Sequence, residues 1–342
     1  MITMSNIEKT LSTPTWQTEL QTAFTNISDL LAYLNLSTQA LDQYDKAAEG
    51  FPLLVTRSYA SRIQPANWQD PLLRQVLPHP DELVNQADFI NDPVGDKEAN
   101  IAPGLLQKYQ GRVLVITTGA CAIHCRYCFR REFQYSGNSA HQSQLESIQQ
   151  HLVKHPNIHE VILSGGDPLM LSDTKFSALF DFLTNLAQVK RIRLHTRLPV
   201  VLPSRITPEL LTTLRASHKK VIIVIHSNHP NELSHDVANS LLSLKNTGAT
   251  LLNQTVFLKG INDDPKTLIE LSVRLFDCHT LPYYLHVLDK VTGSAHFDSK
   301  VHHIHHVYQQ IQKELPGYLV PKLVQELAGE PNKTQLNLAS LA

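Results

Sequence analysis

Short runs of apolar residues recur from Arg112 onward, with the roughly thirty-residue spacing that is typical of βαβ units. The runs cover 113–118, 160–164, 191–196, 220–226, 250–258 and 282–288. Two of the intervening stretches carry apolar residues at helical spacing: Leu145, Ile148 and Leu152 in one, and Leu233, Val237, Leu241 and Leu244 in the other. This alternation predicts right-handed βαβ units that build an α/β fold around a parallel sheet.

Six such units suit a partial (β/α)6 barrel. A doubly wound open sheet is the alternative, because periodicity does not distinguish the two. In a barrel the chemistry lies at the carboxyl ends of the strands, so the residues that follow each apolar run are the candidates for function.

The first 110 residues show a different pattern of apolar residues and prolines. Leu20, Phe24, Ile27, Leu31 and Leu34 recur at helical spacing and predict one amphipathic helix. Short segments interrupted by prolines follow it. We therefore expect a helical and irregular extension over 1–110 that packs on a main domain over 111–315, followed by a short carboxyl-terminal segment over 316–342.

Composition excludes several classes of protein. The 342 residues are 42% hydrophobic and 18% charged, with a net charge of -1, which describes a globular protein with an ample core and no global basic field. We expect neither a nucleic-acid nor a membrane partner, since the longest aliphatic run, 221–225, is far too short to span a bilayer. The amino terminus lacks the pattern of a secretory signal, and a cytoplasmic location is the expectation.

Three of the four cysteines follow the first predicted strand in a CxxxCxxC pattern, at Cys121, Cys125 and Cys128. Four thiolates normally hold a [4Fe–4S] cluster, so three of them leave one iron open to another ligand. The competing interpretation is structural zinc that uses His124 as a fourth ligand, as in a binding module. Cys278 stands alone and is expected to be a buried small hydrophobic residue.

Two further motifs are ambiguous by themselves. Gly165 and Gly166 end the second predicted strand, where the missing Cβ atoms permit either close approach of the backbone to a ligand or a tight turn. Lys333 lies in a Pro-Asn-Lys-Thr turn near the carboxyl terminus. A lysine there is ordinarily a solvated charge, although a reactive amine that bonds to pyridoxal phosphate is the functional alternative.

Taken in order, several motifs resemble one enzyme family. They are the cysteine triplet, Ser-Gly-Gly-Asp-Pro-Leu (164–169), Arg-Leu-Pro-Val-Val-Leu-Pro-Ser-Arg-Ile-Thr (197–207), Asn-His-Pro-Asn-Glu (228–232) and Gly-Glu-Pro-Asn-Lys-Thr (329–334). The triplet resembles the radical S-adenosylmethionine superfamily. The whole set, from about residue 50 onward, is similar to the lysine 2,3-aminomutase family within it. The match is closest to the short members, the elongation factor P (R)-β-lysylation proteins.

The resemblance implies a radical-SAM partial barrel, three cofactors and a residue for each contact. Cys121, Cys125 and Cys128 would hold a [4Fe–4S] cluster, which in turn binds S-adenosylmethionine. Lys333 matches the lysine that bonds to pyridoxal 5′-phosphate. Arg112 matches a residue near the phosphate of pyridoxal phosphate, with Tyr109 and Lys108 as weaker candidates. Gly165, Gly166 and Asp167 match the turn that binds the methionine part of S-adenosylmethionine. His226 and Gln254 match strand positions that face the cofactors.

The resemblance also implies how a substrate would bind. Arg130 matches the arginine that holds the substrate carboxylate, for which a guanidinium has the right geometry. Asp289 and Glu326 match two carboxylates that pair with a distant ammonium group. One carboxylate and one distant ammonium describe a diamino acid, which favours lysine over glutamate provided that both acids face the pocket.

The activity implied is an isomerase reaction, the 2,3 amino shift that converts L-α-lysine to (R)-β-lysine with the help of an electron donor. The chain ends nine residues after Lys333, whereas longer relatives continue. This difference favours a functional link to elongation factor P and its lysyl ligase over a stand-alone role in amino-acid metabolism.

Four histidines at 302, 303, 305 and 306 suggest a metal site at first sight. However, Val301, Ile304, Val307 and Ile311 form the apolar stripe of the same predicted helix. The histidines then fall largely on its other side, so we expect a solvated face instead of a metal site.

Overall fold

A mixed sheet of ten strands, arranged in chain order, forms the centre of the molecule. The computed structural model describes residues 15–37, 41–133 and 142–336. Strands β3 to β9 pair in parallel, and an antiparallel strand pairs at each end of this set. The strands are β1 (Asn100–Ala102), β2 (Leu105–Leu106), β3 (Arg112–Thr118), β4 (Glu160–Gly165), β5 (Arg191–Thr196), β6 (Lys220–His226), β7 (Thr250–Val256), β8 (Leu281–His286), β9 (Lys322–Gln325) and β10 (Thr334–Gln335).

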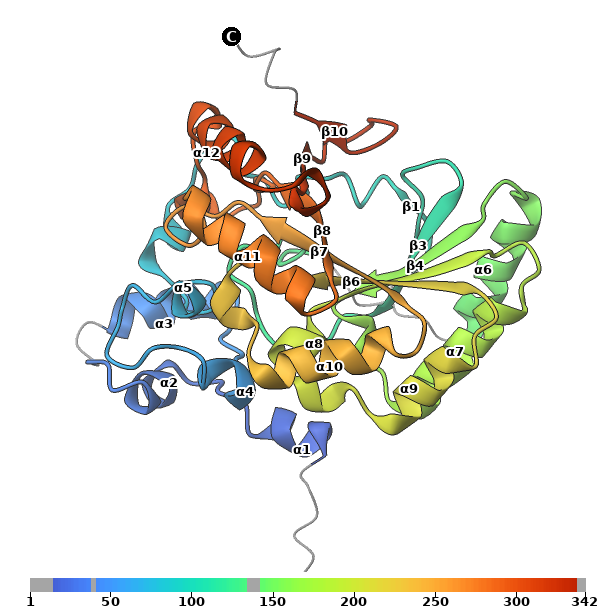
Figure 1. The fold of residues 1–342 in the computed structure, drawn as a ribbon, viewed down its shortest axis with the longest axis horizontal. Coiled ribbons are helices and arrows are strands. Elements are labelled where there is room, and N and C mark those ends of the chain that lie inside the picture. Colours follow the sequence, from blue (N-terminus) through green and yellow to red (C-terminus); the bar gives the residue numbers. More distant parts are fainter. Residues whose placement is uncertain (1–14, 38–40, 134–141, 337–342) are drawn as a thin grey trace, which may run out of the picture.

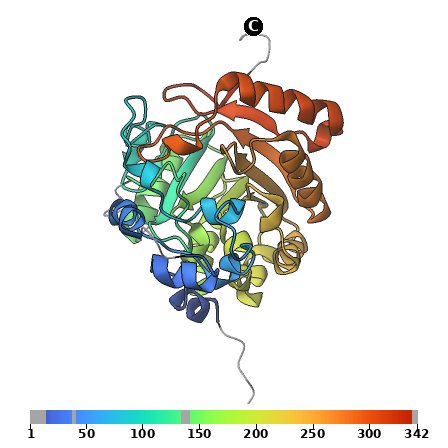
Figure 2. The ribbon, with the colours of Figure 1, turned by 90° about the vertical axis from the view of Figure 1, so that its left-hand side faces the viewer.

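The six predicted apolar runs all become parallel strands, from β3 to β8. Both predicted helical stripes lie on helices that connect these strands, with only Leu233 outside its helix. The helices that pack outside the sheet in Figures 1 and 2 are α6 (Gln142–Lys154), α7 (Asp173–Asn185), α8 (Leu198–Val201), α9 (Pro208–Arg215), α10 (His235–Lys245), α11 (Pro265–Asp277) and α12 (Val301–Glu314). The α/β prediction is confirmed.

The sheet curves without closing, because β1 and β10 form its two ends and do not pair with each other. A partial barrel is therefore confirmed. Two features were not foreseen: β9 adds a seventh parallel strand beside β8, and the β1–β2 hairpin extends the sheet beyond β3. The segments on either side of the barrel thus each add strands to its sheet.

The predicted single helix near the amino terminus is wrong in one respect. The apolar stripe lies on two short helices, α1 (Trp16–Gln21) and α2 (Ile27–Tyr33), with Phe24 between them. Phe24 exchanges two backbone hydrogen bonds with Val55, at 2.7 and 2.9 Å, and Asn26 caps α2. Pairing with a distant segment therefore overrides the local helical pattern, although the apolar residues remain buried apart from the partly buried Leu20.

The rest of the amino-terminal extension covers the side of the sheet toward which the parallel strands point (Figure 1). Its helices are α3 (Leu41–Gly50), α4 (Arg57–Ala60), α5 (Pro71–Arg74) and the 3-10 helix η1 (Pro80–Leu83). Glu82 of η1 receives hydrogen bonds from the Nε and Nη2 atoms of Arg126, at 2.8 and 2.6 Å. Arg126 lies in the cysteine loop and is fully buried, so this ion pair fastens the extension to that loop.

One expectation about an isolated feature is confirmed and a second holds only in part. Cys278, at the end of α11, lies in the hydrophobic core. In α12, Ile304, Val307 and Ile311 are buried and His302 and His306 are exposed, but Val301 is also exposed, and His303 and His305 are partly buried. Among the described residues no group of His, Cys, Asp or Glu side chains forms a metal-ion site, and no described helix is long and apolar enough to cross a membrane.

Gly165 and Gly166 are required by the chain itself. A Cβ atom on Gly165 would lie 2.5 Å from the Thr118 carbonyl oxygen, and one on Gly166 would lie 2.3 Å from the Ala120 carbonyl oxygen. The backbone N–H of Gly166 also donates to the Thr118 oxygen at 2.7 Å. The turn after β4 therefore packs backbone to backbone against the start of the cysteine loop, and a side chain there has no space.

We predict that Gly166→Ala destabilises the protein by about 1–3 kcal/mol, the usual cost of forcing atoms into a well-packed region. The measurement is the free energy of unfolding by denaturant. Gly317→Ala is the matched control, because a Cβ atom there meets no atom within 4 Å. Equal stability of the two variants would contradict the proposed packing role.

Candidate functional site

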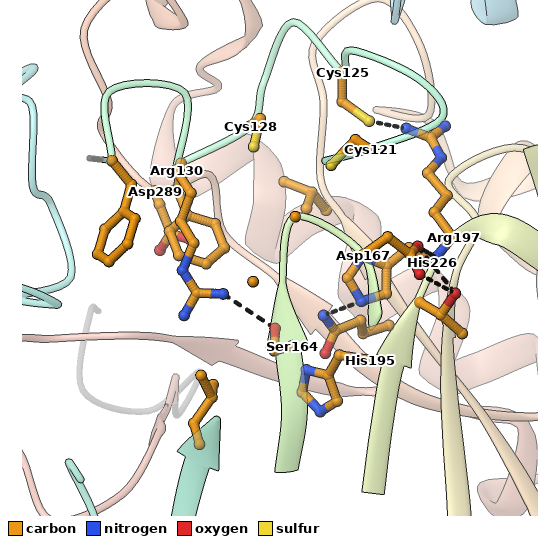
Figure 3. A pocket seen from close by; sticks show the side chains of 18 of the residues that line it. Cys121, Cys125, Cys128, Arg130, Ser164, Asp167, His195, Arg197, His226 and Asp289 are labelled. Carbon is orange, nitrogen blue, oxygen red and sulfur yellow. Dashed lines mark hydrogen bonds between the residues drawn. The ribbon is translucent and has the colours of Figure 1, made fainter. Parts of the chain in front are cut away.

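One cavity of about 400 Å³ collects nearly all the chemistry-bearing residues of the barrel (Figure 3). It is lined by strands β3 to β8, by the cysteine loop and by the segment that carries Lys333. Arg112, the first residue of β3, lines it together with Cys121, which follows the end of that strand. A seven-residue strand is about 20 Å long, so the cavity extends along the length of β3.

The cysteine loop follows β3, and all three thiols line the cavity. His124 also lines the cavity, but other groups hold its ring: its Nδ1 atom is 2.8 Å from the Pro52 carbonyl oxygen, and its ring stacks on Phe51 with centroids 4.8 Å apart. Zinc bonds of about 2.3 Å would bring four ligands within about 4 Å of one another. His124 is instead held by Pro52 and Phe51, so the arrangement does not favour zinc with His124 as its fourth ligand.

Burial makes two of these thiols, those of Cys121 and Cys128, hard to ionise without a cationic partner. It raises the pKa of Cys128 to about 11 and that of Cys121 well above its ordinary value. Metal ions bind thiolates and displace their protons. Three thiols on one loop, lining a common cavity, fit an iron–sulfur cluster anchored by three cysteines, which is larger than a single ion.

Asp167 lines the cavity, but its carboxylate is occupied by the protein. It accepts hydrogen bonds from Thr196 Oγ1 at 2.8 Å and from the backbone N–H groups of Arg197 and Leu169 at 2.7 and 3.0 Å. Burial raises the pKa of Asp167 to about 6, although these hydrogen bonds act to lower it. Asp167 therefore joins the end of β5 to the turn after β4, next to Gly165 and Gly166.

A buried row of alternating charges, which we call the charge chain, connects Lys333 to Arg130. Lys333 pairs with Glu326, and Lys108 bridges Glu326 and Asp96 with Nζ–O distances of 3.0 and 2.6 Å. Asp96 also accepts from Arg130 Nε at 2.7 Å. Although burial opposes ionisation, the two lysines lower the pKa of Glu326 to about 2. The row joins the carboxyl-terminal segment, the extension and the barrel.

The charge chain changes the expectations for several residues. Arg130 also donates to Ser164 Oγ at 3.1 Å, so it lies at the end of β4 as well as beside Asp96. Lys108 pairs with two carboxylates, and this occupies the amine that sequence reasoning offered to a phosphate. Glu326, predicted to pair with a substrate ammonium, holds two lysines of its own chain.

Asp289, like Asp167, is an acid of the cavity that stays outside this row. It follows β8, and no described residue gives its carboxyl a hydrogen bond or an ion pair. Burial raises its pKa to about 7, and repulsion by Glu326 adds to the shift. A partly buried carboxyl with a raised pKa and no partner is suited to receive a cation from a ligand.

Arginines and tyrosines form the part of the lining near Arg112. The Arg112 guanidinium lies 4.3 Å from the centre of the Tyr109 ring. Tyr283 and Tyr284 share a hydrogen bond of 2.8 Å between their hydroxyls, and Lys333 Nζ lies 5.9 Å from the centre of the Tyr284 ring. Arg193 joins Arg112 in lining the cavity, although its guanidinium also pairs with Glu160 at the start of β4. Guanidinium groups near a lysine amine form an environment that favours a phosphate.

Three histidines line the cavity from strands β5, β6 and β8. His226 on β6 is hydrogen-bonded to Gln254 on β7, with 2.7 Å between their nitrogens, so the structure brings these two predicted residues together. Burial lowers the pKa of His226 to about 3 and those of His195 and His286 well below the ordinary value. The Nε2 atoms of His195 and His286 are buried and unpaired among the described residues, which leaves two hydrogen-bonding positions for a ligand.

Sequence reasoning missed several lining residues. Arg193 and His195 alternate with buried apolar residues on β5, so a period of two would have placed both on the cavity face. Tyr284 and His286 on β8 have the same spacing. Asp96 lies in an irregular segment and carries no local pattern, and only the folded chain brings it to Arg130.

We predict that Asp289→Asn stabilises the protein more at pH 8 than at pH 5. An aspartate in an unfolded chain titrates near 3.9, whereas Asp289 in the folded chain has a pKa of about 7. The loss of folding stability caused by ionising Asp289 therefore reaches its full size above about pH 7 and disappears as the pH falls toward 4. The measurement is the melting temperature at both pH values. The exposed Asp181→Asn in α7 is the control, and a gain independent of pH would contradict the raised pKa.

Comparison with known proteins agrees with this geometry. The sequence profile of the Radical SAM superfamily matches residues 115–271, from β3 into α11. L-lysine 2,3-aminomutase of Escherichia coli is 41% identical over 96% of this chain and 97% of its own length. The Haemophilus influenzae protein of the same name is 43% identical over 93% and 94%.

A more distant relative, L-lysine 2,3-aminomutase of Clostridium subterminale, is 31% identical over 93% of this chain and 77% of its own. Among solved structures, a radical SAM methyltransferase from Sphaerobacter thermophilus shares 14% identity, over 65% of this chain and 68% of that one, with a TM-score of 0.46. Membership of the superfamily implies a [4Fe–4S] cluster and S-adenosylmethionine. The chain belongs to the lysine 2,3-aminomutase family of radical S-adenosylmethionine enzymes and is an isomerase of the aminomutase type.

Proposed function

We propose that the protein uses a [4Fe–4S] cluster, S-adenosylmethionine and pyridoxal 5′-phosphate to convert L-α-lysine to (R)-β-lysine. The observation that carries the proposal is that one cavity contains three cysteines, Arg130, Asp289 and Lys333. When bound, S-adenosylmethionine at the cluster supplies a 5′-deoxyadenosyl radical, and pyridoxal phosphate supplies the π system through which the amino group moves. The residues of the chain orient these groups and keep water out.

The lining of the cavity fits the three cofactors. Cys121, Cys125 and Cys128 are the cluster ligands in this proposal. Lys333 is the amine for pyridoxal phosphate, and Arg112 with Arg193 would hold the phosphate next to Tyr284. The unpaired Nε2 atoms of His195 and His286, together with the His226–Gln254 pair, offer hydrogen bonds to the parts of the ligands that cross the middle of the cavity.

Charge supports lysine as the substrate. Arg130 is nine-tenths buried and uses Nε for Asp96 and Nη1 for Ser164. The geometry of a guanidinium still allows it to bind a carboxylate. Asp289 has no partner among the described residues, and Glu326 would lose one of its two lysine partners if Lys333 bonds to the cofactor. The site then offers two acids to the side-chain ammonium of lysine, which glutamate lacks.

We further propose that the β-lysine is made for attachment to elongation factor P by its lysyl ligase, and that a separate electron donor reduces the cluster. The resemblance of the sequence motifs to those of the elongation factor P (R)-β-lysylation proteins supports this assignment. Incubation with a lysyl ligase and elongation factor P would test it: β-lysylated factor is expected from α-lysine only when this protein is present.

We predict that anaerobically reconstituted protein, with a reductant and S-adenosylmethionine, forms β-lysine from L-lysine. The measurement is chromatography of the derivatised amino acids, with chiral analysis of the product. We expect Asp289→Asn to lower kcat/KM for lysine at least ten-fold, because the substrate ammonium loses a charged partner. Product from glutamate but not from lysine would refute the assignment of the substrate.

We predict that borohydride reduction of the protein with pyridoxal phosphate attaches the label to the peptide that contains Lys333. The measurement is mass spectrometry after proteolysis. Lys333→Ala should lose the label, whereas Lys322→Ala, on the neighbouring strand β9 and outside the cavity, should keep it. Labelling of a different lysine would remove Lys333 from its proposed role.

A further inference from the structure

The cysteine loop contacts a second polar network that the proposed reaction does not use. Arg197 follows β5 and reaches back to the loop, where its Nη1 atom donates to the sulfur of Cys125 (Figure 3) and to the Tyr127 hydroxyl. Its Nη2 atom donates to Gln75 Oε1 at 2.9 Å and to Glu232 Oε2 at 3.0 Å. One guanidinium therefore joins a predicted cluster ligand to three other polar side chains.

The network is held from several sides. Asn228 donates to the Tyr127 hydroxyl at 2.6 Å and to Gln75 Oε1 at 3.0 Å. Glu232 is fully buried, and its Oε1 atom accepts from the Asn228 backbone N–H at 2.9 Å. The backbone N–H of Arg197 donates to Asp167 at 2.7 Å. Since Arg197 is only 7% exposed, its guanidinium has little freedom to move away from Cys125.

We propose that Arg197 is a positioning residue for the iron–sulfur cluster, which holds the Cys125 sulfur by a hydrogen bond and raises the reduction potential of the cluster. The proposal rests on Cys125 being a cluster ligand. Reduction adds one negative charge to the cluster and its thiolates, and a donor with a positive charge at one sulfur stabilises that added charge. Glu232 opposes this effect, because its carboxylate offsets the charge of Arg197.

A purely structural role for Arg197 makes different predictions. A structural residue would affect folding or iron binding, and Arg197 and Glu232 would then behave alike when either is replaced. The electrostatic role predicts opposite changes, because one variant removes a positive charge near the cluster and the other removes a negative charge. The direction of the shift in potential therefore distinguishes the two roles.

The experiment is a redox titration of the reconstituted protein without S-adenosylmethionine, followed by the electron paramagnetic resonance signal of the reduced cluster. For Arg197→Gln we expect the equilibrium constant for reduction to fall about ten-fold, which for one electron is a shift of about 59 mV to more negative potential. For Glu232→Gln we expect a shift to less negative potential.

Arg205→Gln is the matched control. Arg205 is also fully buried and ion-paired, with Asp173 at 2.8 Å, but it does not line the cavity. This variant should lose stability and keep the potential of the unchanged protein. An unchanged potential in Arg197→Gln, or an equal shift in Arg205→Gln, would overturn the proposal.

A measurement of iron content tests the premise, that Cys125 is a cluster ligand, separately from the proposed role of Arg197. Cys125→Ala should lose iron if Cys125 is a ligand, and a cluster that survives this change would refute the ligand assignment independently of Arg197. If Arg197→Gln does not retain iron, the Glu232→Gln variant decides: a less negative potential supports the proposal, and an unchanged or more negative one overturns it.

Discussion

The charge chain from Lys333 to Arg130 is the interaction on which the site depends. Its five side chains come from three parts of the sequence, and each carries a charge that is at least four-fifths buried. A buried charge is tolerable only when it is paired, and removing one partner of such a pair typically costs about 3–5 kcal/mol. The alternation of signs therefore holds the carboxyl-terminal segment and the amino-terminal extension to the barrel.

The same charge chain leaves Asp289 as an acid whose carboxyl has no partner in the part of the chain that the structure describes. The protein thus balances most of the charges in the cavity internally and leaves the carboxyl of Asp289 without a partner among the described residues. The raised pKa of Asp289 follows from this arrangement, because burial and the nearby Glu326 both disfavour its charge. A bound ammonium group would offset the unfavourable free energy of the Asp289 charge in the folded protein. Binding of a cationic substrate would therefore relieve an instability that the fold already contains.

The cysteine loop is held from all sides by groups outside it. Glu82 holds Arg126 from the extension, and the turn at Gly165 and Gly166 packs against the start of the loop. Arg197 reaches the Cys125 sulfur from β5. A cluster that reacts with an outside ligand needs its protein ligands held in place. Much of the amino-terminal extension serves this purpose, which explains why a segment without catalytic motifs packs so closely on the barrel.

The local pattern of the sequence was sufficient for the strands and for the motif residues. Alternating apolar runs predicted β3 to β8, because burial on both faces imposes a local pattern on parallel strands. The cysteine spacing and the glycine pair are equally local. The pattern failed at Phe24, where pairing with Val55 divides a helix in two.

Only the tertiary structure decided which side chains meet. Asp96 has no local signature, yet it lies between Arg130 and Lys108. Glu326 and Lys333 are seven residues apart, but their pairing with each other and with Lys108 depends on β9 and β10 joining the sheet. The physical reason is that hydrophobic periodicity reports on burial along one element, whereas the partner of a buried charge is set by contacts between segments distant in sequence.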